Sequence, residues 1–322
     1  MPTNPRANPS LTCSVVMATR NRPEPIRETL ASLNRQTTLP TMGIMVDSSD
    51  GTQTEEIVAR LKPSLQFPVL YRHTEIKSAA KQRNLGADLA SSDILLFMDD
   101  DLDLEPGCIA ELLNVFENDP QQQIGGVSAT ITNQTYSDPK GFNRLLLGCC
   151  LGQWHGSYAG RLLGPAVNFL PEDLPDTVQE TEWLPSTCTA YRREAFLQHR
   201  FSEFEGYSFA EDVDISSRIA KSYKLVNTTR ARVFHHDMGK GTHRDWQTLG
   251  KSMVVNRYGI MTRTMGRTRL LDHLRLFCFE MVYSSATWLA AGASGQRLLL
   301  LSRLLRGKTA GFASVWLRTA GE

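Results

Sequence analysis

The chain has 322 residues, enough for one large α/β domain or two smaller ones. Its 35 basic and 34 acidic side chains leave a formal charge of +1, so no overall electrostatic field favours nucleic acid as a partner. The six cysteines show neither a CxxC pair nor the Cys/His spacing of a metal site. No apolar stretch reaches the roughly 20 residues that span a bilayer, and the N-terminus has no signal-peptide pattern. These features predict a reducing, cytoplasmic setting.

Short apolar segments alternate with helical patterns in the first part of the chain. We expect strands at 11–18, 42–46, 69–71, 93–98 and 125–132, and helices that begin near Pro25 and span 54–61, 79–89 and 106–118. Strands that alternate with helices of this length predict an α/β fold with a mostly parallel sheet and right-handed crossovers.

The second part of the chain is less regular. Residues 134–182 are rich in Gly and Pro and carry no pattern that assigns an element. A strand, a turn and the start of a helix are expected from Trp183, followed by a helix at 209–222 and a strand at 225–233. From about 246 the chain becomes helical and basic. We therefore divide it into an α/β unit at 1–245 and a helical, basic region at 246–322.

Three polar clusters, TRNRP, DSSDG and DDD, each follow one of the expected strands. In parallel α/β sheets, ligands bind at the carboxyl ends of the strands. Because all three clusters fall at that edge, the sequence predicts a ligand site there.

The DDD cluster consists of Asp99, Asp100 and Asp101 at the end of an apolar strand. Since strand side chains alternate between faces, Asp99 and Asp101 are expected to project together and Asp100 to point away. Two carboxylates on one side suit a hard divalent cation that shares phosphate oxygens. The alternative is a solvated acidic turn that ends the strand.

A second acidic pair, Glu211 and Asp212, begins an expected helix. One of the two could act as a general base, because a hydroxyl nucleophile needs a proton acceptor within hydrogen-bond reach. The alternative is that both complement the helix dipole.

The histidines His235 and His236 follow the last expected strand. An extended backbone sends adjacent side chains to opposite faces, so at most one of them is expected to bind a metal or phosphate. Four cations could contact phosphate or a base, or be ordinary surface charge: Arg20, Arg22, Lys81 and Arg83. The sequence contains no G-x-G-x-x-G, no P-loop and no G-x-S-x-G motif.

The order of these motifs resembles the family-two glycosyltransferases with a GT-A fold. The resemblance rests on TRNRP, VDSSDG, KQRNLGADLASSDILLFMDDD, WLPSTCTAYRREAF and FAEDVDISSRIAKSYKLV, and it covers roughly residues 12–240. It implies a mostly parallel sheet flanked by helices, with a helical C-terminal region. It also implies inverting transfer of a sugar from a UDP-, GDP- or dTDP-sugar, with Mn²⁺ or Mg²⁺ as cofactor. The acceptor would be a glycan or a lipid-linked sugar, as in polysaccharide biosynthesis.

The resemblance also implies roles for individual residues. The donor nucleotide would be bound by Thr19, Arg20, Asn21, Asp47, Lys81, Arg83, Asn84, Asp99 and Asp100. Asp99 and Asp101 match the acidic positions of the DxD motif that holds the metal, and His235 or His236 falls near the diphosphate. Asp212, paired with Glu211, matches the catalytic base. Members often read VDDGS where this chain has VDSSDG, so the second acidic position is lost or shifted to Asp50.

Trp183 and Tyr191 could stack on an acceptor sugar or be core aromatics. The basic C-terminal region could rest on the anionic, cytoplasmic face of a membrane or form a helical cap over the acceptor site. Two other functions are weighed. A metal-dependent nucleotidyltransferase would need a Gly-rich phosphate loop near the N-terminus, and TRNRPEP has no glycine. A non-catalytic nucleotide-sugar-binding or scaffold protein would not need both acidic pairs.

Overall fold

The computed structural model describes residues 11–236, 245–290, 292 and 294–319. The first half contains β1 (Cys13–Thr19), α1 (Pro23–Asn34), β2 (Met42–Asp47), α2 (Gln53–Leu61), the 3₁₀ turn η1 (Lys62–Ser64), β3 (Val69–His73), α3 (Ala79–Asp88), β4 (Ile94–Met98), β5 (Leu102–Leu104), α4 (Cys108–Glu117) and β6 (Ile124–Ile131). These match the elements expected from the sequence, with β5 added.

The middle of the chain contains α5 (Gly141–Leu151), β7 (Leu162–Leu163), β8 (Val167–Asn168), β9 (Val178–Thr181), β10 (Cys188–Arg192), α6 (Arg193–His199), α7 (Glu211–Ile219) and β11 (Lys224–His235). The C-terminal part contains α8 (Trp246–Gly259), the π-helical turns η2 (Ile260–Thr264) and η3 (Cys278–Tyr283), α9 (Leu270–Phe277), α10 (Ser284–Ala290) and α11 (Gly295–Thr319). The unassigned segment 134–182 thus supplies one helix and three short strands.

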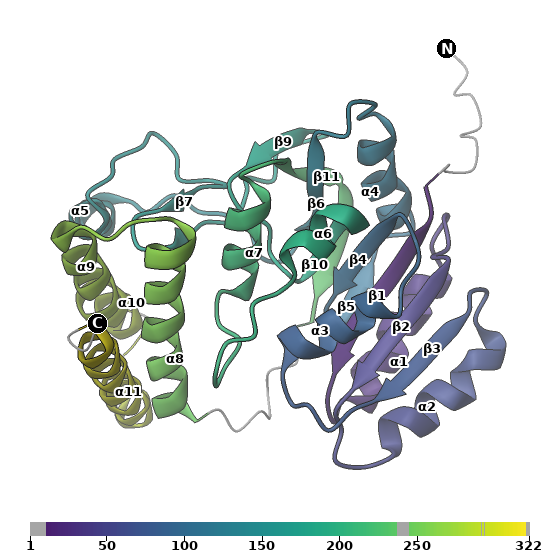
Figure 1. Ribbon diagram of the computed structural model, residues 1–322, viewed down its shortest axis with the longest axis horizontal. Helices are drawn as coiled ribbons and strands as arrows, with labels where there is room; N and C mark the ends of the chain where they lie inside the picture. The colour runs from purple at the N-terminus through teal and green to yellow at the C-terminus, as the bar shows by residue number, and fades with distance from the viewer. Residues whose placement is uncertain (1–10, 237–244, 291, 293, 320–322) are drawn as a thin grey trace.

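A mixed sheet forms the centre of the molecule, in the order β3-β2-β1-β4-β10-β6-β11-β5, with β9 paired to β11 (Figure 1). The pairs β3-β2, β2-β1, β1-β4 and β6-β11 are parallel. β10 runs antiparallel to both of its neighbours, and β5 and β9 run antiparallel to β11. The main strands β1–β4, β6 and β11 therefore share one direction, as the alternation of elements predicts.

Helices cover both faces of this sheet because successive strand residues point to opposite sides. Val15 and Met17 pack with α1, α2 and α4 in one apolar cluster. Val16, between them, packs with α3, α6 and α7 on the other face. This arrangement leaves the carboxyl ends of the parallel strands uncovered by these helices.

The C-terminal helices form a separate layer beside the sheet (Figure 1). α8 and α11 pack against each other closely, because a Cβ atom at Gly250 or Gly307 would overlap a backbone carbonyl of the facing helix. A buried ion-pair network ties the layer together: Glu280 of η3 contacts Arg257 of α8 and lies 2.7 Å from Lys308 Nζ of α11. No helix among the described residues is both long and apolar enough to cross a membrane.

Candidate functional site

The three polar clusters meet at the carboxyl edge of the sheet. In the parallel register, Thr19 of β1 pairs with Asp47 of β2, and Met17 pairs with Met98, the residue before the acidic triplet. β11 runs parallel to β6 and ends at His235, and its pairing with β5 sets His235 opposite Leu102. The sheet therefore delivers residues from four separate parts of the sequence to one place.

The three carboxylates of the acidic triplet, which lies between β4 and β5, have different hydrogen-bond partners. The Asp99 carboxylate accepts a hydrogen bond from Arg83 Nη2 at 2.9 Å, and Asp101 Oδ1 lies 3.1 Å from His235 Nε2. Asp100 accepts from Thr19 Oγ1 at 2.5 Å. Burial raises the pKa of Asp100 to about 6. Asp100 is thus hydrogen-bonded to Thr19 and absent from the group of residues that could hold a metal ion.

Asp99, Asp101 and His235 could hold one metal ion. One ligand atom from each lies within 4.8 Å of the other two. Two carboxylates and one imidazole form a donor set that suits Mn²⁺, while Mg²⁺ prefers oxygen ligands. Burial raises the pKa of Asp99, and the neighbouring Asp101 charge raises it further against the opposing effect of Arg83. A divalent cation would relieve this repulsion, so the residues fit such an ion.

The two adjacent histidines lie in different environments. The backbone N–H of His236 donates to the carbonyl of Asp101 at 3.0 Å. The exposed His236 ring packs against Phe234, with ring centroids 5.0 Å apart. His236 is absent from the metal-ligand group formed by the described residues, whereas His235 belongs to it.

Arg22, for which the sequence left phosphate contact and ordinary surface charge as alternatives, lies beside the acidic triplet. Its guanidinium lies 3.3 Å from Asp100 Oδ1 and 2.5 Å from Asp101 Oδ2. Arg22 therefore supplies positive charge to the acidic cluster. Its position directly after β1, in the same TRNRP cluster as Thr19, is the signal that points to this role.

Arg83 connects the acidic triplet to the second acidic pair. Nη2 donates to Asp99, and Nη1 donates to Glu211 Oε1 at 3.0 Å. The Arg83 side chain is only 7% exposed, and its guanidinium also lies over the ring of Phe201. One buried guanidinium thus holds two carboxylates that lie 112 residues apart in sequence, on β4's end and on the first turn of α7.

Glu211 and Asp212 have different partners. Glu211 is buried and accepts from Arg83, and burial together with the Asp212 charge raises its pKa to about 7. Asp212 is partly exposed, and its Oδ1 accepts from the backbone N–H of Val213 at 2.8 Å. Burial also raises the pKa of Asp212, against backbone hydrogen bonds from Val213 and Ser186 that lower it. Asp212 is the more available proton acceptor of the two.

The C-terminal layer holds the loop that leads into this pair. Asn256 Nδ2 of α8 donates to the carbonyls of Tyr207 and Phe209, each at 3.1 Å. Ala210, which follows, has a left-handed backbone with φ +61°, a conformation that costs a non-glycine residue roughly 1–2 kcal/mol. The bonds from Asn256 help to hold this strained turn directly before Glu211.

The residues expected around the donor nucleotide fall into two groups. Asp47 is fully buried, and its carboxylate accepts from Ser49 and from the Tyr71 hydroxyl. Asn84 is occupied by the backbone of Phe201. Exposed groups form the other set: Asp50 accepts from Arg20 at 3.1 Å, Asn21 at 3.0 Å and Lys77 at 2.6 Å, and Lys81 Nζ lies 3.7 Å from Glu203. The acidic group open to a ligand on this rim is therefore Asp50 rather than Asp47.

Of the two alternatives for Trp183 and Tyr191, stacking on an acceptor sugar or packing in the core, their burial favours the core. Trp183 is 3% exposed and donates from Nε1 to the carbonyl of Phe169 at 2.7 Å. Tyr191 is fully buried and packs edge-on against Phe97, with centroids 6.1 Å apart. Trp183 packs between the β7-β8 hairpin and α7, and Tyr191 packs between the sheet and α6. Neither ring therefore presents a face to a ligand.

Comparison with known sequences gives the same family as the motifs. The family model described as Glycosyl transferase family 2 matches residues 14–200. Validoxylamine A glucosyltransferase of Streptomyces hygroscopicus subsp. limoneus is 29% identical over 164 residues, which are 50% of this chain and 30% of that protein. An uncharacterized glycosyltransferase of Haemophilus influenzae is 33% identical over 108 residues, 33% of this chain and 35% of that protein. The chain thus matches about a third of the length of these relatives.

Solved structures share the fold at low identity. A mannosyltransferase of Pyrobaculum calidifontis, solved in complex with GDP-Man and Mn²⁺, has a TM-score of 0.56 at 16% identity and covers 97% of this chain and 90% of its own. GalNAc-T7 with UDP, GalNAc and Mn²⁺ has a TM-score of 0.56 at 15% identity, over 86% of this chain and 57% of that one. Staphylococcus aureus TarS has a TM-score of 0.51 at 15% identity, over 92% and 81%. The fold is that of the GT-A glycosyltransferases, and the chain belongs to glycosyl transferase family 2.

Proposed function

We propose that the chain transfers a sugar from a nucleotide-sugar donor to an acceptor hydroxyl by a single displacement that inverts the anomeric carbon. The observation that carries the proposal is the double contact of Arg83, which joins Asp99 of the acidic triplet to Glu211 beside Asp212. This contact keeps a candidate diphosphate site and a candidate base in one continuous cluster. The Pyrobaculum mannosyltransferase and GalNAc-T7, which share the fold, were solved with GDP-Man or UDP and with Mn²⁺.

Asp99, Asp101 and His235 are the residues that would hold Mn²⁺ or Mg²⁺. When bound, such an ion neutralises negative charge on the diphosphate of the donor and of the departing nucleotide. The fit rests on the donor set described above.

Arg22 and Arg83 would stabilise the same leaving group from the protein side. Breaking the bond between the sugar and the phosphate leaves additional negative charge on the nucleoside diphosphate. A guanidinium held where that charge develops lowers the barrier, because it needs no reorganisation during the reaction. Arg22 is 28% exposed and next to Asp101, so a diphosphate bound there would lie within its reach.

Asp212 would accept the proton from the acceptor hydroxyl as its oxygen attacks the sugar. A carboxylate with a raised pKa is a better proton acceptor than an ordinary surface aspartate. Glu211 would act as a positioning residue, since its carboxylate is already engaged by Arg83. The rim of Arg20, Asn21, Asp50 and Lys77 would meet the base or ribose of the nucleotide. The acceptor would be a glycan or a lipid-linked sugar.

The test has a binding arm and a transfer arm. Thermal-shift titration with UDP, GDP and dTDP and their sugars, with and without Mn²⁺, should identify a stabilising nucleotide. Asp212→Asn should keep that stabilisation while transfer falls by about 10³-fold or more, because the nearly isosteric amide cannot accept the proton. The matched control is Glu194→Gln, an exposed acidic residue of α6.

Two results would contradict the proposal. Full transfer by Asp212→Asn would remove the base assignment. Stabilisation by nucleotides that is the same with and without divalent metal, and unchanged in Asp99→Asn, would remove the metal site. Nuclear magnetic resonance of the product anomer decides between inversion and retention.

A further inference from the structure

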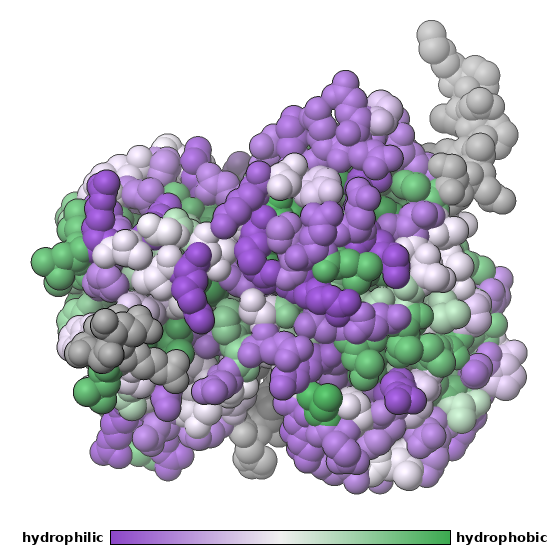
Figure 2. Space-filling model, in the orientation of Figure 1, coloured by the Kyte–Doolittle hydropathy of each residue, from purple (hydrophilic) through white to green (hydrophobic). Residues whose placement is uncertain are grey.

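The end of the helical layer farthest from the sheet carries large apolar side chains in solvent. α5 and α9 pack against each other there (Figure 1). Phe142 of α5 and Leu270 of α9 are each 75% exposed, and Leu145 and Leu274 are also exposed. Single exposed leucines are common, but a group on adjacent helices marks an interaction surface. Figure 2 shows hydrophobic atoms at the left edge of the molecule, where Figure 1 places these helices.

The same surface continues onto the C-terminal end of α11. The ring of Phe277 on α9 lies 5.3 Å from that of Phe312 on α11, and Phe312 lies 6.0 Å from Trp316. Trp316 and Leu317 are both exposed. The apolar surface therefore runs from α5 across α9 to α11, and we call it the outer apolar face: Phe142, Leu145, Leu270, Leu274, Trp316 and Leu317.

Positive charge accompanies this face. From residue 281 to residue 319 the sequence contains arginine and lysine but no aspartate or glutamate. Arg303 and Arg306 are exposed on α11, and the charge of Arg303 helps to lower the pKa of Asp245 at the start of α8. Counted from Leu299, Arg303, Arg306 and Leu317 follow after 4, 7 and 18 residues, which are close to whole turns and place all four on one side of the helix. α11 thus presents leucine and arginine together to solvent.

We propose that the outer apolar face rests on an anionic lipid bilayer surface, with α11 lying along it and not crossing it. Leucine and aromatic side chains that enter the interface, combined with arginines that face lipid headgroups, are the composition of interfacial helices. Each arginine near an anionic bilayer surface increases the binding affinity of such a segment roughly fivefold.

A second copy of this chain is a poorer occupant of the face. A twofold dimer would bring the same patch of both copies together, so the acid-free α11 segments would face each other. Their arginines would repel one another, since α11 itself carries no carboxylate to offset them. An anionic bilayer supplies the missing negative charge.

This inference extends the proposed function. Binding to a bilayer does not depend on that function, but the identification of a lipid-carried acceptor does. α11 packs on α8, and α8 holds the loop before Glu211 through Asn256. A bilayer under α5, α9 and α11 would therefore be linked by rigid helices to the proposed base. This arrangement favours an acceptor carried on a lipid over a freely diffusing glycan.

The test measures sedimentation of the full chain with vesicles of phosphatidylcholine alone and of phosphatidylcholine mixed with phosphatidylglycerol. The wild-type chain should bind the anionic vesicles, and added salt should weaken this binding. The double variant Leu270→Ser, Leu274→Ser should reduce vesicle binding about tenfold or more, since each leucine buries apolar area in the bilayer interface. Arg303→Glu with Arg306→Glu should reduce it by at least about fivefold for each arginine.

Leu89→Ser and Arg60→Glu change exposed residues of the same types near α3 and on α2, and both should bind like the wild type. Circular dichroism melting checks that every variant folds. Wild-type binding that is absent, or equal for the two kinds of vesicle, would overturn the proposal. So would a dimer, seen by light scattering, that Leu270→Ser with Leu274→Ser dissociates while vesicle binding is unchanged.

Vesicle binding also separates this inference from the proposed function. Asp212→Asn should bind vesicles like the wild type whether or not it transfers sugar. If the sugar-transfer experiments contradict the proposed function while vesicle binding is as expected, only the proposed function is overturned.

Discussion

Arg83 Nη1 donates to Glu211 Oε1 at 3.0 Å, across 128 residues of sequence. Both side chains are buried, so each charge depends on the other for compensation. The second arm of the same guanidinium contacts Asp99. Arg83 is therefore the residue on which the geometry of the whole acidic cluster depends.

Replacing Arg83 should reduce transfer even when charge is kept. In Arg83→Lys a single ammonium replaces a planar fork, and it cannot reach Asp99 and Glu211 in the same way. We expect kcat/KM for the donor sugar to fall about 10²-fold in Arg83→Lys and further in Arg83→Ala. Steady-state kinetics with Arg60→Lys as the control would show this. Near-normal kinetics in Arg83→Lys would mean that only the charge matters.

Removing Arg22 should affect metal and donor in opposite directions. Arg22 contacts Asp100 and Asp101, so in Arg22→Ala the carboxylates lose a competing cation. Mn²⁺ alone should then bind about tenfold more tightly, whereas the nucleoside diphosphate should bind more weakly in the presence of Mn²⁺. Isothermal titration calorimetry of both ligands provides the measurement. A parallel weakening of the two affinities would instead assign Arg22 a purely structural role.

Asn256→Ala should slow transfer without removing donor binding. Asn256 touches no proposed ligand, but it holds the backbone of Tyr207 and Phe209 before the strained Ala210. Loss of two hydrogen bonds should let this loop relax, and kcat should fall about tenfold while the KM for the donor changes little. Asn118→Ala, at an exposed helix end, is the matched control. A change confined to melting temperature would show that the loop holds its position unaided.

Glu280→Gln should destabilise the fold in a pH-dependent way. Burial alone would raise the pKa of Glu280, but Arg257 and Lys308 outweigh it and hold the pKa below its ordinary value. A carboxyl with a lowered pKa contributes stability above its unfolded pKa, and this contribution is lost as the pH falls through the folded pKa. At pH 7 we expect a loss of about 3 kcal/mol, because two buried cations lose their partner.

The deficit of Glu280→Gln should therefore shrink in acid, where the wild-type carboxyl also becomes protonated. Urea unfolding of both proteins at neutral and acidic pH measures the difference, with Glu194→Gln as the exposed control. A deficit that stays constant across this range would show that the network contributes through packing and not through charge.

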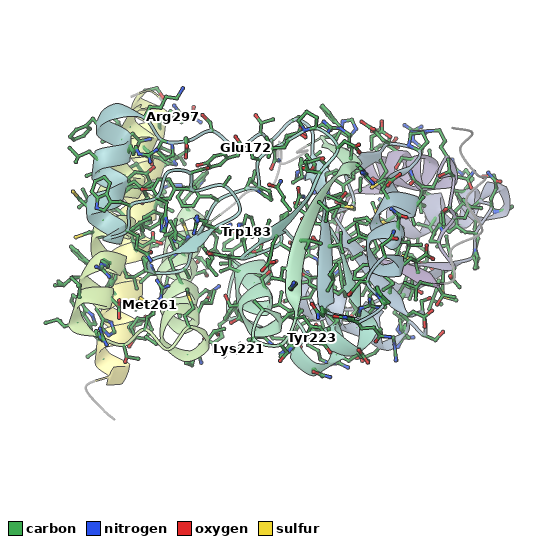
Figure 3. All side chains as sticks on the ribbon, turned by 90° about the horizontal axis from the view of Figure 1, so that it is seen from above. Glu172, Trp183, Lys221, Tyr223, Met261 and Arg297 are labelled. Carbon is green, nitrogen blue, oxygen red and sulfur yellow. The ribbon has the colours of Figure 1, made fainter. Side chains whose placement is uncertain are left out.

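Figure 3 shows side chains filling the region between the sheet and the helical layer. Lys221 and Trp183 come from the α/β part of the chain and lie on the side that faces Met261 of η2. This junction was not predictable from sequence. Residues 134–182 carry no clear periodicity, because short strands such as β7 and β8 are stabilised by contacts with α5 and the C-terminal region and not by a local pattern.

The sequence by itself determined the α/β fold and the edge of the sheet at which the polar clusters gather. Both follow from local rules: the alternation of apolar strands with helices sets the sheet, and parallel strands bring their carboxyl ends to one side. The two-residue period of an extended chain also predicts the grouping of Asp99 with Asp101, which are two of the three residues that could hold a metal ion.

Only the tertiary structure decided which partners each charged group has. The pairing of β11 with β5 brings the imidazole ring of His235, and not that of His236, to the carboxylate of Asp101. The packing of α3 against the first turn of α7 makes Arg83 a bridge, and the core buries Trp183 and Tyr191. These outcomes depend on contacts between segments far apart in the chain, which no local period encodes.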